Sequence, residues 1–380
     1  MLAVAFGVFL ALQQAVFWLL GFFLFWRIPR CRSRGVVPRS TRISVIIPAR
    51  NEEHNLPVLL RSLAAQECAP EEIIVVDDGS DDGTAEVAAR FGARVVTAGA
   101  VPEGWVGKSW ACWTGARSAK GDLLVFLDAD TILAGGALAA FASTQRADGG
   151  LVSVMPLLAT RRPYEALAAV FNIVVVASVN EFSILGRRLL PTGCFGACVV
   201  SRREEYFAAG GHVAVKGHIA EDFALGRRYR ALGMPVTCYG GRGTASVRMY
   251  PDGFRSLVEG YTKNMAIGAS DIRRDFKALI VAWIAGATLC VIASLASLHP
   301  DLAIYRTMQI VFYALYAAQV YWMLRRIGNF GPFTALLFPV PLAFFHLVYL
   351  RSVHSIRRRN CVTWKGRVIR SSLGDKVEAG

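Results

Sequence analysis

The stretch Leu123-Leu124-Val125-Phe126-Leu127-Asp128-Ala129-Asp130 decides the fold class, because an apolar strand runs directly into two carboxylates. A second apolar run, Ile73–Val76, ends in Asp77-Asp78-Gly79-Ser80. In open α/β sheets, ligands collect outside the carboxyl ends of the strands, and carboxylates there can hold a divalent cation against a diphosphate. Asp, Gly and Ser also follow many strands simply as turn residues. The two motifs together favour a nucleotide and metal site.

Working outward, strand and helix patterns alternate from Arg42 to about Ser270. This alternation predicts an α/β domain with a mostly parallel mixed sheet. We expect strands at residues 43–47, 73–76, 94–97 and 123–127, with helices that open near Asn51 and near Asp81.

Two common nucleotide-binding motifs are missing from this domain. The first strand leads into Pro48-Ala49-Arg50-Asn51-Glu52, which lacks the glycine fingerprint of a dinucleotide site. Gly107-Lys108-Ser109 lacks the upstream glycine of a P-loop. Both absences argue against a nicotinamide-dependent oxidoreductase and against a P-loop NTPase.

The chain is too apolar for a purely soluble protein, with 54% hydrophobic residues and a mean hydropathy of +0.40 over 380 residues. Leu2–Trp26 carries no charge and exceeds the roughly 20 residues needed to cross a bilayer. It has no basic start and no small-residue cleavage site, so we interpret it as a retained anchor. Leu279–Leu298 and Leu302–Leu324 are two further candidate spans, joined by a short loop. Phe333–Leu350 contains Pro339 and Pro341. It either spans or forms a broken re-entrant element, and we favour the second alternative.

The net charge of +14 is concentrated beside these apolar runs. The first span is followed by Arg27, Arg30, Arg32, Arg34, Arg39 and Arg42. The tail carries Arg351, Arg357, Arg358, Arg359, Lys365, Arg367 and Arg370. This distribution predicts a multi-pass cell-membrane protein with a cytoplasmic catalytic domain, and it disfavours nucleic acid as a partner. The eight cysteines are scattered, which predicts reduced thiols and no zinc site.

These features divide the chain into five parts. We expect an anchor at 1–27, a basic juxtamembrane linker at 28–41, a catalytic domain at 42–272, transmembrane or re-entrant helices at 273–350, and a basic cytosolic tail at 351–380.

Four motifs in order resemble those of the family 2 inverting glycosyltransferases. They are Ser44–Glu52, Val76–Ser80, Asp128–Asp130 and Glu221-Asp222. Further strings resemble bacterial membrane members of that family that act on carotenoid acids (diaponeurosporenoate) or are associated with hopanoids: Pro102–Lys108, Tyr250-Pro251, Gly260–Asn264 and Val362–Arg367. The resemblance implies a GT-A fold, which binds a nucleotide-diphosphate sugar.

The resemblance also implies roles for the donor side. Asp77 would contact the base of the nucleotide and Asp78 its ribose, while the pocket would be lined by Pro48, Ala49 and Glu52. The donor diphosphate would be met by Lys108, and Lys263 could also reach it. Mg²⁺ or Mn²⁺ would bridge Asp130 to the diphosphate, and Asp128 would touch the ribose or the metal. For Asp78, Glu52 and Lys108 the alternatives are a turn residue, a first-turn helix acid and a solvent-facing lysine.

On the acceptor side, Asp222 would be the general base and Glu221 its supporting neighbour. The alternative for both is compensation of the helix dipole at a helix start. Thr192–Ala197 resembles the acceptor loop of the family. Trp105 either closes the site or anchors the core, and His212 and His218 are more often structural in such loops.

The processive polysaccharide synthases of this family carry Gln-x-x-Arg-Trp late in the domain, and no such string occurs between Asp222 and Ser270. We therefore expect transfer of a single sugar, with UDP-glucose as the favoured donor and a carotenoid acid or hopanoid as the favoured lipid acceptor. The alternatives are a ceramide, diacylglycerol or polyprenyl-phosphate glycosyltransferase, or a catalytically silent membrane scaffold. The apolar stretch Phe171–Leu185 is either core or a surface that admits a lipid tail.

Overall fold

The structure is a computed structural model that describes residues 2–32, 41–189, 191–218, 220–268, 272–359, 361–364 and 367–370. It contains two compact units. The helical unit comprises Met1–Arg27, Ala159–Arg188 and Met249–Gly380, and the sheet unit comprises Ile28–Leu158 and Leu189–Arg248. The five domain boundaries expected from the sequence stay predictions. Arg34, Arg39 and Lys365 lie outside the described residues.

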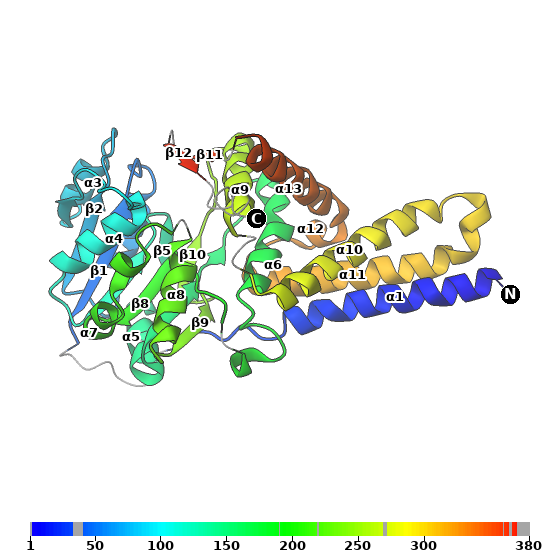
Figure 1. Cartoon of the computed structure of the whole chain (residues 1–380), viewed down its shortest axis with the longest axis horizontal. Helices are drawn as coiled ribbons and strands as arrows, with labels where there is room; N and C mark the ends of the chain where they lie inside the picture. Colours follow the sequence, from blue (N-terminus) through cyan, green and yellow to red (C-terminus); the bar gives the residue numbers. More distant parts are fainter. Residues whose placement is uncertain are drawn as a thin grey trace, which may run out of the picture. The chain divides into compact units, whose positions relative to one another are not determined.

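A seven-stranded sheet in the order β3-β2-β1-β4-β8-β6-β9 forms the centre of the sheet unit (Figure 1). Its strands are β1 (Ile43–Ala49), β2 (Glu72–Asp77), β3 (Arg94–Thr97), β4 (Leu123–Leu127), β6 (Leu151–Met155), β8 (Cys198–Arg202) and β9 (Val236–Gly240). The first four are parallel to one another, and β6 is parallel to β9. Only β8 runs against its neighbours β4 and β6 in this sheet. The predicted α/β class with a mostly parallel mixed sheet is confirmed.

A small second sheet follows the Asp128–Asp130 motif directly. It has the order β5-β10-β7, with β5 at Thr131–Leu133, β7 at Leu157–Leu158 and β10 at Ala245–Val247. Because β5 begins one residue after Asp130, this sheet fixes the backbone on the far side of the motif.

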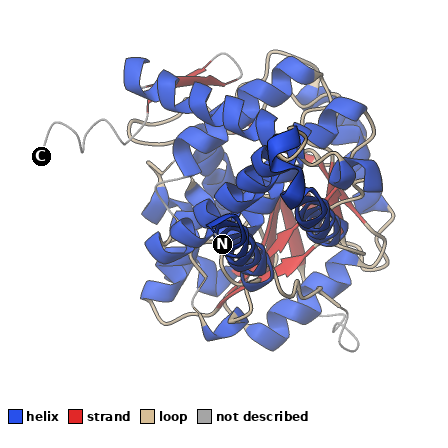
Figure 2. Ribbon diagram, turned by 90° about the vertical axis from the view of Figure 1, so that its right-hand side faces the viewer, coloured by secondary structure: helices blue, strands red, loops and turns tan. Residues whose placement is uncertain are grey.

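Helices of the same unit pack on both faces of the large sheet, whose strands are red in Figure 2. The core on one face joins alternate strand residues such as Val45 and Val125 to apolar residues of α2 (Leu56–Ala64), α3 (Thr84–Arg90) and α5 (Ala137–Asp148). On the other face, α4 (Gly107–Ser118) lies against β1 and β2. Its Gly115 allows this close approach, since an added Cβ would lie 2.4 Å from an Ile46 methyl group. The unit is completed by α7 (Arg203–Ala208), η3 (Gly211–Val215) and α8 (Glu221–Ala231).

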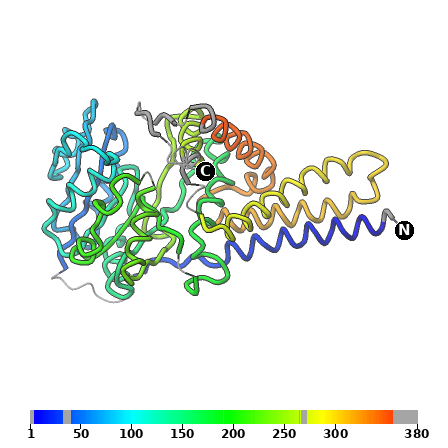
Figure 3. Tube along the Cα trace, in the orientation of Figure 1, coloured from blue at the N-terminus to red at the C-terminus, as the bar shows by residue number. Residues whose placement is uncertain are grey.

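Three long helices lie side by side in the helical unit although they come from opposite ends of the chain (Figures 1 and 3). They are α1 (Leu2–Leu24), α10 (Arg274–Ala296) and α11 (Arg306–Ile327). By length and composition, the segments of the described helices that could cross a membrane are Val4–Leu24 and Arg274–Ala296. The first and second predicted spans therefore have helices suited to the bilayer, and the third falls on α11.

The remaining described elements of this unit are η1 (Pro163–Ala168), α6 (Ala169–Ser178), η2 (Gly186–Arg188), α9 (Phe254–Gly268), η4 (Pro300–Tyr305), α12 (Pro332–Leu336), α13 (Pro339–Arg359), β11 (Cys361–Trp364) and β12 (Arg367–Arg370). The helix break before Pro339 agrees with the predicted interruption, and whether this segment crosses a bilayer stays a prediction. Within Phe171–Leu185, α6 is almost entirely buried, whereas Ile184 and Leu185 are exposed.

Candidate active site

The predicted donor motifs meet at one edge of the large sheet. Strands β1, β2 and β4 are parallel, so their carboxyl ends point the same way. Ala49 and Asp77 are the last residues of β1 and β2 and face each other in register. Asp128 follows the end of β4 directly. The sheet therefore brings together motifs that lie far apart in the sequence.

The Asp77-Asp78 pair combines a turn with a buried carboxylate. The carboxylate of Asp77 accepts hydrogen bonds from the backbone N–H and hydroxyl of Ser80, at 3.0 and 2.5 Å to Oδ1. Asp78 is buried, and its N–H donates to the carbonyl of Ala49 (2.9 Å). Burial raises the pKa of Asp78, Arg50 opposes the shift, and Asp77 adds to it. Asp77 thus has the turn role that its sequence also allows, and the nucleotide contacts stay predictions.

Glu52 lies in the turn between β1 and α2, and the helix expected to open near Asn51 begins only at Leu56. Its N–H donates to the hydroxyl of Thr84 (2.8 Å), and its Oε2 accepts a hydrogen bond from the side chain of Asn55 (2.8 Å). Its negative charge also contributes to raising the pKa of Asp130. Glu52 therefore supports the helix start and at the same time acts electrostatically on the predicted metal site.

Lys108 connects a predicted donor residue, Asp128, with a predicted acceptor-side residue, Glu221. It is the second residue of α4, and its Nζ lies 2.8 Å from Asp128 Oδ1 and 3.1 Å from Glu221 Oε1. Burial would lower the pKa of Lys108, but the carboxylates of Asp128 and Glu221 outweigh it and hold this pKa well above its ordinary value. Lys108 is therefore a fixed cation between two carboxylates. Its predicted contact with the donor diphosphate stays a prediction.

Asp128 and Asp130 are the residues that would supply oxygen ligands to the predicted cation. Burial raises the pKa of Asp130 to about 7, and the charges of Asp128 and Glu52 add to the effect. Such crowding of carboxylates fits a divalent cation, because hard ions prefer oxygen ligands and would offset the repulsion. The described residues contain no group of three or more His, Cys, Asp or Glu side chains with metal-binding geometry. The pair fits a cation that takes its other ligands from the donor and from water.

Asp222 is held by the loop that resembles the acceptor loop. Glu221 and Asp222 open α8, as predicted. The Oδ2 atom of Asp222 accepts a hydrogen bond from the N–H of Gly196 (3.0 Å), and Oδ1 accepts one from the N–H of Phe223 (2.9 Å). Burial raises the pKa of Asp222 to about 7, with a further contribution from Glu221 and an opposing one from Lys108.

The acceptor loop fits closely against the start of α8. The thiol of Cys194 donates to the carbonyl of Asp222 (2.9 Å). A side chain at Gly193 would meet the ring of Phe223 at 2.2 Å, and one at Gly196 would lie 3.1 Å from the Asp222 carboxylate. Sequence reasoning identified this loop but not the contacts of Cys194 and Gly196 with Asp222. Their proximity to Glu221-Asp222 depends on the fold, and no local signal indicates it.

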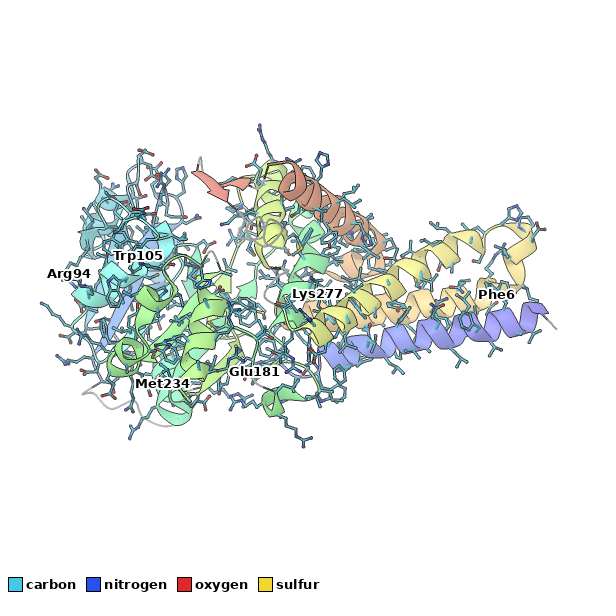
Figure 4. The ribbon with its side chains drawn as sticks, viewed as in Figure 1. Phe6, Arg94, Trp105, Glu181, Met234 and Lys277 are labelled. Carbon is cyan, nitrogen blue, oxygen red and sulfur yellow. The ribbon has the colours of Figure 1, made fainter. Side chains whose placement is uncertain are left out.

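Other predicted residues divide between the two units. Trp105 lies in the sheet unit (Figure 4). Its ring packs edge-on against that of Trp110, with the ring centroids 5.1 Å apart. His212 is buried and hydrogen-bonded to the Tyr206 hydroxyl (2.7 Å), and burial lowers its pKa to about 3, so it is a neutral core residue. His218 is exposed. Lys263 belongs to α9 in the helical unit, and its diphosphate contact stays a prediction.

The chain matches a known enzyme family. The family model described as glycosyl transferase family 2 matches residues 44–161. The chain is 37% identical over 333 residues to 4,4'-diaponeurosporenoate glycosyltransferase from Staphylococcus aureus strain MRSA252, which covers 86% of this chain and 87% of the relative. The protein of the same name from strain USA300 is 36% identical with the same coverage. The protein therefore belongs to glycosyl transferase family 2 and is a glycosyltransferase.

Solved glycosyltransferases are also similar to this chain. The mannosyltransferase PcManGT from Pyrobaculum calidifontis, in complex with GDP-Man and Mn²⁺, is 18% identical, covers 84% of this chain and 96% of its own, and has a TM-score of 0.49. Glucosyl-3-phosphoglycerate synthase from Mycobacterium tuberculosis, in complex with Mn²⁺, UDP-glucose and phosphoglyceric acid, is 22% identical, covers 64% of this chain and 87% of its own, and has a TM-score of 0.41. Family membership and the order of the sheet together confirm the predicted GT-A fold.

Proposed function

We propose that this protein is a membrane-bound, inverting glycosyltransferase that transfers one glucose from UDP-glucose to the carboxylate of a carotenoid acid. The observation that carries the proposal is the 37% identity, over 86% of the chain, to a relative whose name specifies diaponeurosporenoate as the acceptor. The proposed donor and acceptor carboxylates and Lys108 all occur in the sheet unit, where Lys108 contacts both Asp128 and Glu221.

The membrane location is supported by α1 and α10, which are long and apolar enough to span a bilayer. A carotenoid acid is itself a lipid-soluble acceptor, so an enzyme anchored in the bilayer meets it there. The arginines that follow α1, beginning with Arg27, favour a cytoplasmic catalytic domain.

On the donor side, Asp78 and Glu52 bind the nucleoside, while Asp128 and Asp130 hold Mg²⁺ or Mn²⁺. When bound, the cation neutralises charge on the departing nucleoside diphosphate. Lys108 keeps Asp128 in place through their 2.8 Å contact and adds a positive charge beside the diphosphate.

On the acceptor side, Asp222 contacts the attacking group. The new bond forms between an acceptor oxygen and the anomeric carbon, and the bond from that carbon to the diphosphate oxygen breaks on the opposite face. UDP leaves with the bonding electrons, and the anomeric configuration inverts. A carboxylate acceptor is already ionised, so it needs no base. Asp222 orients it by donating a hydrogen bond from its protonated form, which burial favours. A hydroxyl acceptor would instead need the ionised form of Asp222 as its general base.

The test uses the full-length protein in lipid vesicles with UDP-glucose, Mn²⁺ and diaponeurosporenoic acid. We expect a product heavier by one hexose in the mass spectrum, with the β-anomeric ester in the proton NMR spectrum. Parallel reactions contain a hopanoid alcohol, diacylglycerol, ceramide or polyprenyl phosphate as acceptor. Faster transfer to any of these, or an α-anomeric product, would contradict the proposal.

A further inference from the structure

The loop Ser183–Arg188, which is exposed except at the buried Ser183 and the half-buried Gly186, is attached to the end of the first candidate span. The N–H groups of Trp26 and Arg27 donate to the carbonyl of Phe182 at 2.8 and 3.2 Å, and the N–H of Ile184 donates to the carbonyl of Phe23 at 2.8 Å. Three backbone hydrogen bonds, two at Phe182 and one at Ile184, therefore hold this loop, here called the interface loop, against the last turn of α1 and the residues just beyond it.

The interface loop has a defined conformation. Asn180 adopts a left-handed backbone conformation (φ 61°), which turns the chain after α6. Phe182 is fully buried beneath the loop, and the side chain of Glu181 is buried with its Oε1 atom 3.6 Å from Arg187 Nε. Buried residues on its inner side thus fix which residues face outward.

The outward surface combines apolar and basic side chains. Ile184 is 49% exposed and Leu185 is 36% exposed, and Trp26 beside them is 49% exposed. Arg27 and Arg188 are exposed as well. A tryptophan with neighbouring leucine, isoleucine and arginine side chains is the composition of a surface that lies at the boundary between lipid tails and anionic headgroups.

The position of α1 determines at which level of a bilayer this surface would lie. A helix of 23 residues is about 35 Å long, which matches the roughly 30 Å hydrocarbon core of a bilayer. In Figure 4, Glu181 and Lys277 lie at the same end of the long helices, opposite Phe6. Lys277 and the exposed Arg274 belong to the first turn of α10, where Phe276 packs near Phe23 of α1 with ring centroids 6.3 Å apart. Arg27, just beyond α1, and the basic residues of the first turn of α10 therefore lie at the same end of the two helices.

We propose that the interface loop inserts Ile184 and Leu185 into the headgroup region of an anionic bilayer, with Arg188 and Arg27 bound to lipid phosphates. This inference depends on the membrane location in the proposed function, but not on the sugar or the acceptor. It gives the protein a second lipid contact besides its spans, made by the segment that follows α6.

The test places the photoreactive residue benzoylphenylalanine at position 185 of the full-length chain, in vesicles of phosphatidylcholine alone or mixed with phosphatidylglycerol. The matched control carries the probe at position 58, since Val58 is similarly exposed (41%) on α2 of the sheet unit. After irradiation, lipid adducts are identified by mass spectrometry. We expect adducts from position 185 and only background from position 58.

The charge contribution is tested in the same vesicles with Arg188→Glu, and with Arg117→Glu on α4 as the matched exposed control. Phosphatidylglycerol should be enriched among the adducts at position 185 by about five-fold for each arginine at the surface. Arg188→Glu should reduce this enrichment. Arg117→Glu should leave it unchanged. Background labelling at position 185, or no enrichment of phosphatidylglycerol, would overturn the inference. Because the measurement needs no turnover, lipid adducts from an enzyme inactive on carotenoid acids would refute the proposed acceptor and leave the interface loop supported.

Discussion

At the residue scale, the role of Asp222 depends on the chemistry of the acceptor. A hydroxyl must lose a proton as it attacks, and a positioned base contributes about 10²- to 10⁴-fold to such a step. A carboxylate acceptor has no proton to lose. We therefore expect Asp222→Asn to reduce kcat with the carotenoid acid by only about ten-fold, and to reduce kcat with the corresponding carotenoid alcohol by about 100-fold or more.

Asp222→Ala is the control for orientation, because alanine cannot hydrogen-bond to either acceptor. It should reduce turnover of the acid more than Asp222→Asn does, while KM for UDP-glucose changes little in both variants. Initial rates with each acceptor at saturating Mn²⁺ measure these effects. An equal loss with acid and alcohol in Asp222→Asn would show that Asp222 does not act as a base for either acceptor.

Asp130 should make stability depend on pH when no metal is present. Its folded-state pKa of about 7 is above the ordinary value of 3.8, so the folded protein favours the protonated form. The stability that this preference gives is complete below about pH 4 and is lost as pH rises through 7. The Asp130→Asn side chain cannot ionise, so above pH 7 this variant should be more stable than wild type by about 2 kcal/mol. This is half of the free energy that corresponds to raising the pKa from 3.8 to about 7, because the side chain of Asp130 is only partly buried.

Thermal unfolding in detergent with a chelator, between pH 5 and 8, measures this difference. The control is Asp122→Asn. The carboxylate of Asp122 is exposed and accepts a hydrogen bond from Arg42, which lowers the pKa of Asp122. That variant should gain no stability at high pH. A wild-type protein as stable as Asp130→Asn at pH 8 would contradict the crowding of carboxylates at this site.

The types of the site residues could be predicted from the sequence, but their contacts could not. Asp78, Asp130 and Asp222 follow strand ends or open a helix, and these positions have local sequence signals. The contact of Lys108 with both Asp128 and Glu221 has no such signal, because it arises from packing between α4 and segments distant in the chain. Cys194 and Gly196 contact Asp222 for the same reason.

At the element scale, the buried side chain of Gln319 on α11 connects this helix to both α1 and α10. Gln319 accepts a hydrogen bond from the Trp283 indole (2.9 Å) and donates one to the carbonyl of Trp18 (2.7 Å). A Cβ at Gly21 would lie 2.5 Å from the Gln319 side chain. Gly21→Val should therefore displace the amide from both partners and cost about 1–2 kcal/mol.

Thermal unfolding in detergent checks this, with Leu12→Val as the control, since Leu12 is exposed on α1. If the cost arises from Gln319, Gly21→Val combined with Gln319→Ala should be little worse than Gln319→Ala alone, because the two sites share one contact. Strictly additive losses would show that the space around Gly21, and not the hydrogen bonds, sets the stability.

The elements themselves could be predicted best where the sequence signal is long. The strands expected at 43–47, 73–76, 94–97 and 123–127 correspond to β1, β2, β3 and β4. Strands β5, β7 and β10 have only two or three residues, too few to show any alternation. The antiparallel placement of β8 between β4 and β6 depends on long-range pairing, which no single segment specifies.

At the scale of the whole molecule, the proposed reaction should stop after one sugar. The first acceptor is a carboxylate that attacks without losing a proton, but its glucosylated product offers only sugar hydroxyls, which need a base in the correct position. The sequence also lacks the Gln-x-x-Arg-Trp string of the processive synthases. With a large excess of UDP-glucose and a long incubation, the mass spectrum should therefore show a single hexose increment.

Purified glucosyl ester supplied as the only acceptor provides the control, and it should release UDP no faster than a reaction without acceptor. A ladder of hexose increments in either reaction would mean that the site accepts sugar hydroxyls. In that case the acceptor pocket would have to hold a growing saccharide, and Asp222 would act as a base in every round. The two reactions thus connect the protonation of one carboxylate to the size of the product that the whole enzyme makes.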